Sequence, residues 1–377
     1  IKALVSPLAE ALWDQGERFG TIGLRFGGYQ LEITTYRAEA YDPATRKPEV
    51  SFGDSLTADL ARRDFTINAM AVCTRTRQLI DPYNGQRDLA ERRLRTPLSP
   101  ESSFNDDPLR MLRAARFIPR FALDVDPLLR QAAHRLAPRV SIVSIERVQA
   151  ELERLFALER PNRGFEFLAE TGLLSAVDVV FESGTRVDQA VSLASQPGTT
   201  SVRRAGFFVP FADELGELLS RLRYSRTQAD LVRAMVDQLQ RVRCFDGTDG
   251  HVRRIVHQLG PLIGGQHPQV ADLDELIRDL VQLADNAAHV EADRQQGQTV
   301  GAFWHAYQRL AANENLSDLG LPVTGADVIA HLGVVPGPVV GQALAMLQER
   351  RLDEGPMSRS DAFEYLDGFG GEQDAAG

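Results

Sequence analysis

Cysteine and membrane-length apolar runs are the two clearest absences from this sequence. Cys73 and Cys244 are the only cysteines among 377 residues, too few for a disulfide framework or a zinc cluster. No apolar run approaches the roughly 20 residues that span a bilayer, and no charged-then-apolar leader opens the chain. We therefore expect a cytoplasmic protein with no membrane partner. Because Ile1 is not a native start, we also expect residues upstream of it.

A net positive charge is absent as well. The chain carries a net charge of −10, which argues against attraction of nucleic acid to the molecule as a whole. An RNA-binding protein of this composition needs a local basic surface. One cluster of arginines could supply it: Arg87, Arg92, Arg93, Arg95, Arg110, Arg113, Arg116 and Arg120.

The most informative stretch of the sequence predicts a helix over 107–121. Asp106 or Asp107 can cap it, and proline suits its first position. At helical spacing, Asp107, Arg110 and Arg113 share one face, while leucines and Phe117 face a core. A carboxylate beside a guanidinium can read the polar edge of a base. An acidic first turn followed by a solvated arginine face explains the pattern equally well.

The N-terminal part is β in character after an initial amphipathic segment, residues 1–19, that predicts a helix. Two strands, 19–26 and 29–37, flank Gly27-Gly28 and predict a hairpin. Alternation in the second strand turns Glu32 away from the apolar layer, toward solvent or a cleft. A buried strand is expected from Ile67 to Val72, and a further strand returns near Leu79.

From about residue 89 the chain is predicted to be helical almost throughout. Apolar spacing indicates helices at 89–94, 107–121, 127–136, 144–158, 160–173, 211–224, 226–243, 249–260, 272–292 and 298–313. Residues 185–204, rich in Ser, Gln and Gly, read instead as a domain boundary or a surface loop.

Three ordered motifs carry a resemblance to a known family. Arg62-Arg63-Asp64-Phe65-Thr66-Ile67-Asn68-Ala69 precedes Ile80-Asp81-Pro82-Tyr83-Asn84-Gly85-Gln86-Arg87-Asp88-Leu89, and Asp106-Asp107-Pro108-Leu109-Arg110 follows. Together they resemble the class II CCA-adding tRNA nucleotidyltransferases and the bacterial poly(A) polymerases, with Asp106 where the family usually has Glu.

The resemblance implies an α+β fold, with a small nucleotidyltransferase (polymerase-beta-like) head and a mostly α-helical remainder. The expected division is a head at 1–88, a neck carrying the base-reading helix at 89–175, a body at 176–320 and a tRNA-binding tail at 321–377. Residues 38–60 resemble the family's mobile loop.

The same resemblance assigns roles to individual residues. Asp107 and Arg110 are expected to select cytosine and adenine. Arg63, Arg113 and Arg116 are expected to hold the triphosphate. The remaining assignments give the ribose 2′-hydroxyl to Asp64, support of the loop to Asn68 and the third active-site carboxylate to Glu32.

The implied reaction is addition of C, C and A to tRNA from CTP and ATP with Mg²⁺, with neither DNA nor membrane as a partner. The alternatives are a poly(A) polymerase, an enzyme that adds only A or only CC, or a non-catalytic tRNA-binding relative. The order of addition, its termination and the oligomeric state stay open.

Two family features are absent. The Gly-Gly-x-Val-Arg-Asp turn does not occur here, and no Asp-x-Asp pair stands at the family's position ahead of the Glu32 strand, so we expect both upstream of Ile1 and expect the chain as printed to be a poor catalyst. No His-Asp dipeptide occurs either, and the histidines of the body are scattered, so no phosphohydrolase site is expected. They are His251, His257, His267, His289 and His305.

Overall fold

The computed structural model describes residues 1–14, 17, 20–40, 49–52, 55–263 and 272–374. Two compact units divide the chain, Ile1–Val143 and Ser144–Gly377. This boundary falls inside the predicted neck, and the predicted four-part division stays a prediction. Among the described residues, no helix combines the length and the apolar character needed to cross a membrane.

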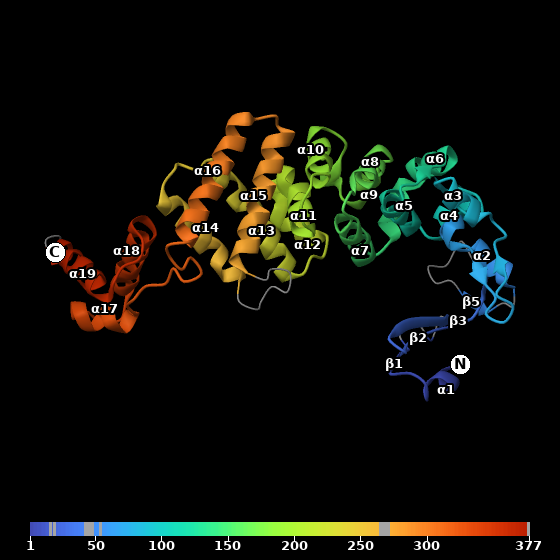
Figure 1. Ribbon diagram of the computed structural model, residues 1–377, viewed down its shortest axis with the longest axis horizontal. Coiled ribbons are helices and arrows are strands. Elements are labelled where there is room, and N and C mark those ends of the chain that lie inside the picture. The colour runs from blue at the N-terminus through green and yellow to red at the C-terminus, as the bar shows by residue number, and fades with distance from the viewer. Residues whose placement is uncertain (15–16, 18–19, 41–48, 53–54, 264–271, 375–377) are drawn as a thin grey trace. The chain divides into compact units, whose positions relative to one another are not determined.

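The first unit combines short strands with helices (Figure 1). Its elements are α1 (Lys2–Val5), β1 (Ala11–Trp13), β2 (Thr21–Phe26), β3 (Tyr29–Thr34), β4 (Arg37–Ala40), β5 (Glu49–Phe52), α2 (Leu56–Ala61), the 3-10 helix η2 (Thr66–Asn68), β6 (Ala71–Val72), β7 (Leu79–Ile80), α3 (Gly85–Ala90), β8 (Arg93–Leu94), α4 (Pro100–Asp106), α5 (Leu109–Arg120), β9 (Asp124–Val125), α6 (Pro127–Leu136) and the 3-10 helix η3 (Ala137–Ile142).

The predicted hairpin is confirmed. Strands β2 and β3 pair antiparallel from Thr21↔Thr34 to Phe26↔Tyr29. The turn between them needs positive φ at both central residues, which glycine adopts without strain, and Gly27 and Gly28 have φ of 56° and 78°.

The helix expected over residues 1–19 is wrong. Among the described residues of this stretch the α-helix is limited to Lys2–Val5, and Ala11–Trp13 forms strand β1 beside β2. Leu4 and Leu8, which the helical pattern placed on an apolar face, are 77% and 62% exposed, so the described residues do not cover that face. The Trp13 ring instead lies over Gly23, where an added Cβ would come within 3.2 Å of it. Sheet pairing therefore overrides the helical spacing.

Two further expectations for the first unit are corrected. The segment from Ile67 to Val72 contains the 3-10 helix η2 and only two strand residues, Ala71–Val72. The predicted helix at 89–94 is displaced, because α3 ends at Ala90 and Arg93–Leu94 pairs in parallel with Asp124–Val125. The return strand at Leu79 is confirmed by its pairing with Val72. Part of the expected loop at 38–60, namely 41–48 and 53–54, lies outside the described residues.

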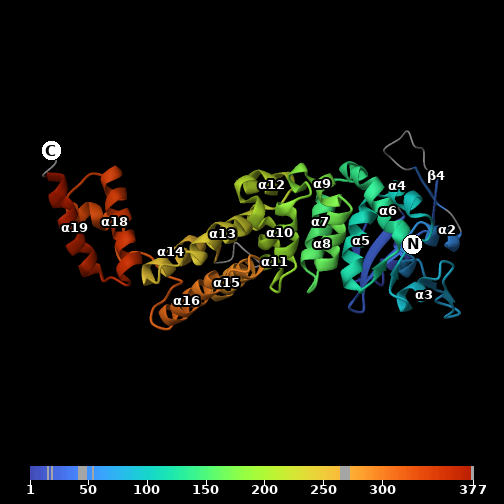
Figure 2. The same cartoon turned by 90° about the horizontal axis from the view of Figure 1, so that it is seen from above.

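The described part of the second unit is built of helices (Figures 1 and 2). They are α7 (Ile145–Phe156), α8 (Asn162–Glu170), α9 (Leu173–Val177), η4 (Val179–Phe181), α10 (Thr185–Ala194), α11 (Thr200–Phe208), η5 (Val209–Glu214), α12 (Leu215–Arg221), α13 (Arg226–Arg243), α14 (Asp249–Leu259), η6 (Gly260–Leu262), α15 (Leu273–Val290), α16 (Arg294–Ala311), α17 (Gly325–Leu332), α18 (Pro338–Glu354) and α19 (Arg359–Asp374).

The loop expected at 185–204 is wrong. Helices α10 and α11 occupy most of it, joined by a turn at Pro197-Gly198 where Gly198 has φ 151°. Val187, Ala190 and Leu193 are buried at helical spacing. The polar residues between these positions concealed an amphipathic helix.

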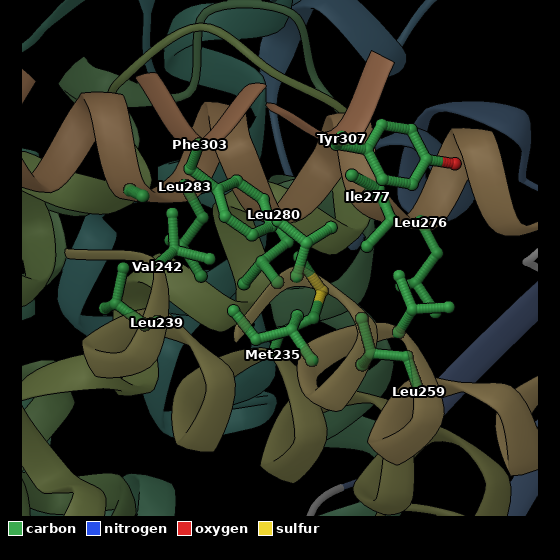
Figure 3. Packing of buried hydrophobic residues seen from close by; sticks show 14 of the residues in the cluster. Met235, Leu239, Val242, Leu259, Leu276, Ile277, Leu280, Leu283, Phe303 and Tyr307 are labelled. Atoms are coloured by element: carbon green, nitrogen blue, oxygen red, sulfur yellow. The ribbon is translucent and has the colours of Figure 1, made fainter. Parts of the chain in front are cut away.

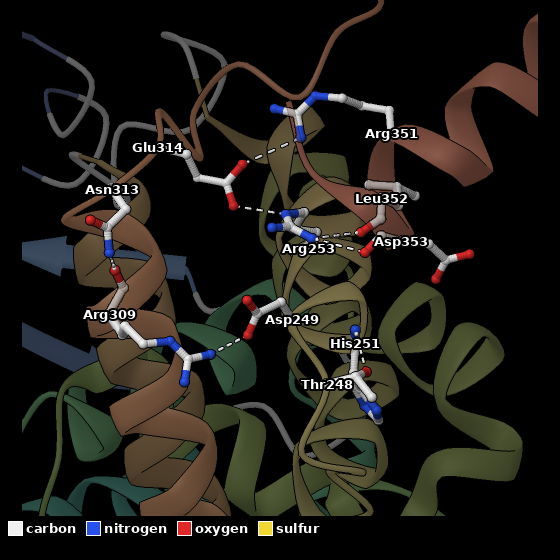
Figure 4. Close-up of polar contacts among 10 residues, drawn as sticks. All are labelled: Thr248, Asp249, His251, Arg253, Arg309, Asn313, Glu314, Arg351, Leu352 and Asp353. Atoms are coloured by element: carbon white, nitrogen blue, oxygen red, sulfur yellow. Dashed lines mark hydrogen bonds and ion pairs between the residues drawn. The ribbon is translucent and has the colours of Figure 1, made fainter. Parts of the chain in front are cut away.

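The core of the second unit lies among α13, α14, α15 and α16, with Met235, Leu280 and Phe303 fully buried near its centre (Figure 3). A smaller core joins α17, α18 and α19. Buried Arg253 links the two groups, because it donates to Glu314 at 2.7 Å and to the carbonyl oxygens of Leu352 and Asp353 at 3.1 and 3.2 Å (Figure 4).

Candidate nucleotide-binding site

The helix predicted over 107–121 exists as α5, which begins at Leu109, and its role in reading a base stays a prediction. Leu109, Leu112 and Phe117 are buried. The Asp107 carboxylate accepts a hydrogen bond from the backbone N–H of Leu109 at 3.2 Å. Pro108 stands immediately before the first helical residue, with φ −60°. The apolar face of α5 is therefore fixed in the core, which orients its polar face.

That polar face meets the segment of the Arg-Arg-Asp motif. Arg113 donates from Nε and Nη2 to the Asp64 Oδ2 at 2.9 and 2.6 Å. Arg110 donates from Nη2 to the backbone carbonyl oxygen of Arg62 at 2.5 Å. Two motifs some forty residues apart in the sequence thus form one hydrogen-bonded group within the first unit.

Asp64 is the centre of this group. It is 9% exposed, and its other oxygen, Oδ1, accepts from the backbone N–H of Phe65 at 2.8 Å and from the Asn68 side chain at 3.0 Å. Four donors around one carboxylate fill its usual acceptor capacity. A ribose hydroxyl could reach Asp64 only by replacing one of these donors. The Asn68 side chain thus holds the Asp64 carboxylate, and its expected role in supporting the loop stays a prediction.

The two remaining arginines of the predicted site, Arg63 and Arg116, differ in their solvent exposure. The Arg63 side chain is about half exposed and pairs with Asp59 at 3.2 Å, so it can exchange that partner for a phosphate. Arg116 is 7% exposed and its guanidinium lies 4.6 Å from the centre of the Phe117 ring. Burial makes Arg116 the less accessible of the two for a triphosphate.

Glu32 stands apart from this group. It is exposed on β3, opposite Gly23 of β2. Within the described part of the chain, no hydrogen bond or ion pair joins it to residues 62–68. Among the described residues, no group of three or more His, Cys, Asp or Glu side chains is placed to hold a metal ion. His267 lies outside the described residues.

Residues 80–89, the connector between the two motifs, hold the segment of the Arg-Arg-Asp motif through a hydrogen bond. Asp81 accepts from the backbone N–H groups of Gly85 and Gln86 at 2.7 and 2.9 Å, which caps α3. Asp88, on the same helix, is fully buried and pairs with Arg95 at 2.8 Å. It also accepts from the Thr66 hydroxyl at 2.6 Å.

Sequence reasoning missed the Asp88–Arg95 pair, because charged residues rarely lie buried and their spacing gave no signal. It also missed α4 and Ser103. The Ser99-Pro100 start is a standard capping signature, and Ser99 accepts from the N–H of Ser102 at 3.2 Å.

The fold and the hydrogen-bonded group around Asp64 indicate the class of protein, which has a small α+β head of the nucleotidyltransferase fold followed by helices. The family comparison is then specific. Residues 2–95 match the poly A polymerase head domain, and residues 122–177 match the domain described as the probable RNA and SrmB-binding site of polymerase A. These two matches agree with the resemblance that the motifs of this chain predicted.

Curated relatives and solved structures agree with this assignment. A CCA-adding enzyme of Bacillus licheniformis is 42% identical over 161 residues, which are 42% of this chain and 40% of that protein. A CCA-adding enzyme of Leuconostoc citreum is 26% identical over 93% of this chain and 81% of its own length. The first match therefore spans about two fifths of its relative.

Similarity of fold extends over nearly the whole chain. The crystal structure of the Bacillus stearothermophilus CCA-adding enzyme in complex with CTP has a TM-score of 0.74 at 23% identity, covering 99% of this chain and 87% of that one. The Thermotoga maritima CCA-adding enzyme complexed with tRNA has a TM-score of 0.59 at 20% identity, covering 97% and 82%. At these identities the likeness establishes the fold.

Proposed function

We propose that the protein to which this chain belongs is a tRNA nucleotidyltransferase that adds C, C and A to tRNA 3′ ends from CTP and ATP in the cytoplasm. The observation that carries the proposal is the hydrogen-bonded group that joins Arg110 and Arg113 to residues 62–64. It connects the base-reading motif to the ribose and triphosphate motif. The named relatives are CCA-adding enzymes, which favours this activity over poly(A) synthesis.

In the proposed reaction the tRNA 3′-hydroxyl attacks the α-phosphate of the bound nucleotide, and pyrophosphate leaves. Mg²⁺ is the metal we propose for the whole protein. To the described residues we assign the binding of nucleotide and RNA. Asp107 supplies acceptors and Arg110 supplies donors to the edge of cytosine or adenine. Arg63 supplies positive charge beside the triphosphate when it exchanges Asp59 for a phosphate, whereas Arg113 is paired with Asp64 and holds that residue against α5.

The RNA is proposed to bind mainly to the first unit, because that unit has a net positive charge whereas the second has a net negative charge. Residues 1–143 contain 21 Lys and Arg against 18 Asp and Glu, whereas residues 144–377 contain 21 against 34. The predicted tail, 321–377, has only three arginines and nine acidic residues. Charge therefore gives the expected RNA contact of the tail no support, and that contact stays a prediction.

Nucleotide binding tests the base-reading role directly. Equilibrium dissociation constants for CTP, ATP, UTP and GTP are measured with the chain as printed, in buffer containing Mg²⁺. We expect CTP and ATP to bind more tightly than UTP and GTP, whose donor and acceptor patterns leave buried polar groups unpaired. Asp107→Ala and Arg110→Ala should weaken CTP and ATP binding and reduce this discrimination. Arg120→Ala, an exposed position on the same helix, is the control.

Melting temperatures separate this role from a structural one. As a capping residue alone, Asp107 would contribute roughly 1 kcal/mol to stability and nothing to base choice. A variant that melts earlier yet rejects UTP and GTP as the parent does would show that α5 is only a scaffold. Extension of tRNAs lacking one, two or three terminal nucleotides, assayed with the natural protein and single nucleotides, then distinguishes CCA addition from A-only, CC-only or poly(A) products.

A further inference from the structure

Arg110 is held by oxygen atoms that carry no charge. Its Nη1 donates to the hydroxyl of Ser103 at 2.8 Å and to the carbonyl oxygen of Ser103 at 3.2 Å, and its Nη2 donates to the carbonyl oxygen of Arg62. Within the described part of the chain it makes no ion pair. Arg113, one turn along the same helix, is neutralised by Asp64. The positive charge of Arg110 therefore stays available to a ligand.

The same contacts fix the plane of the guanidinium. Nη1 is anchored to α4 and Nη2 to the end of α2, so the group cannot rotate about its long stem without breaking one anchor. Nε and the second hydrogen of Nη2 have no partner among the described residues. A guanidinium is planar, so anchoring two of its nitrogens also sets the direction of these two remaining donors.

Ser103 is well placed to act as such an anchor. It is 4% exposed, although serine is usually found at the surface. Its own N–H donates to Ser99 and its carbonyl oxygen also accepts from the N–H of Asp107, so the backbone at this position is fixed from both sides. Burial of a serine hydroxyl is unfavourable unless it is hydrogen-bonded, and the partner that satisfies it is Arg110.

We infer that Ser103 is a positioning residue that orients Arg110 and thereby determines nucleobase selectivity. The inference rests on the proposed function, because it assigns to Ser103 a role in the base choice proposed for Arg110. Recognition of a base edge requires donors held within about 0.5 Å and 10–20° of the productive geometry. Without the hydroxyl, Arg110 keeps only carbonyl acceptors and its donors can move outside that range.

The test compares Ser103→Ala with Ser102→Ala, the exposed serine one residue earlier on α4. Dissociation constants for CTP, ATP, UTP and GTP and melting temperatures are measured for both variants and the parent. We expect Ser103→Ala to weaken CTP and ATP binding about tenfold with UTP and GTP little changed, so that discrimination falls by the same factor, equivalent to about 1.4 kcal/mol. Ser102→Ala should match the parent.

Ser103→Thr keeps the hydroxyl and should retain most of the discrimination, which a general disturbance of α4 would not predict. Equal discrimination in Ser103→Ala and Ser102→Ala would overturn the inference. If Arg110→Ala loses discrimination in that same experiment, the proposed function survives that outcome. A parent chain that binds all four nucleotides equally would overturn both.

Discussion

Gly85 tests whether the connector holds the nucleotide-binding loop in place. A Cβ at this position would lie 2.0 Å from the carbonyl oxygen of Thr66 and 2.7 Å from its carbonyl carbon. A Cβ atom essentially never lies closer than 3.0 Å to a non-bonded atom, so Gly85→Ala must separate α3 from η2 by roughly 1 Å. The neighbour is backbone rather than a flexible side chain, so it cannot turn away.

The cost follows from what that displacement breaks. Overpacking of this kind costs typically 1–3 kcal/mol. The hydrogen bond from Thr66 to the Asp88 carboxylate joins the same two elements, and losing a hydrogen bond to a charged group adds about 1.5–3 kcal/mol. We expect Gly85→Ala to lower the free energy of unfolding of the first unit by about 3–5 kcal/mol. CTP binding should weaken as well, because Phe65 and Asp64 directly precede Thr66.

Urea denaturation and CTP titration measure the two effects. Gly301→Ala is the matched control, because it lies inside helix α16 with no atom within 4 Å of an added Cβ. Removing a glycine from a helix interior should stabilise the protein by about 0.5–1 kcal/mol. If Gly85→Ala unfolds at the same urea concentration as the parent and binds CTP equally well, close packing of α3 against η2 does not support the site.

Three further predictions concern single side chains. Asp64→Ala should reduce the preference for NTP over dNTP and, since it removes the partner of Arg113, also lower the melting temperature; unchanged ribose preference together with a lower melting temperature would leave Asp64 a structural role only. Arg253→Ala should destabilise the second unit by about 3–5 kcal/mol, measured by urea denaturation, because Glu314 is 5% exposed and loses its closest cation (Figure 4). Burial raises the pKa of Asp279 above its ordinary 3.8, so the folded state binds the proton more tightly and stability falls as pH rises through that pKa. Asp279→Asn should therefore have a higher melting temperature than the parent at pH 7, but not below pH 3.8. If variant and parent have the same melting temperature at both pH values, this reasoning is contradicted.

The helices could be predicted from the sequence where one face is continuously apolar. The interval 127–136 is reproduced by α6, 226–243 by α13, and Ser144 stands directly before α7. The predictions failed where long-range pairing decides the structure. Ala11–Trp13 becomes a strand because β2 offers an open edge, which no local pattern in the first 19 residues reveals.

The candidate site divides in the same way. Motif resemblance selected Asp64, Asn68, Arg110 and Arg113, and the structure brings these four side chains together with residue 62. It could not select Ser103, and it gave no role to Asp88 within the connector motif, because a serine or an aspartate carries no sign of burial in its local sequence. Their roles depend on partners that the fold brings to them, such as the guanidinium of Arg110, which donates to the Ser103 hydroxyl.

Two arginines on one helix thus acquire different chemistry from their acceptors alone. Arg113 faces the Asp64 carboxylate, and the pair locks the loop to α5. Arg110 faces a hydroxyl and two carbonyl oxygens, which satisfy its geometry and leave its charge in place. A carboxylate at position 103 would hold the guanidinium more strongly but neutralise it, whereas an alanine would leave the charge and lose the orientation. A buried serine therefore meets both requirements of the base-reading role that we propose for Arg110, because its uncharged hydroxyl orients the guanidinium without neutralising it.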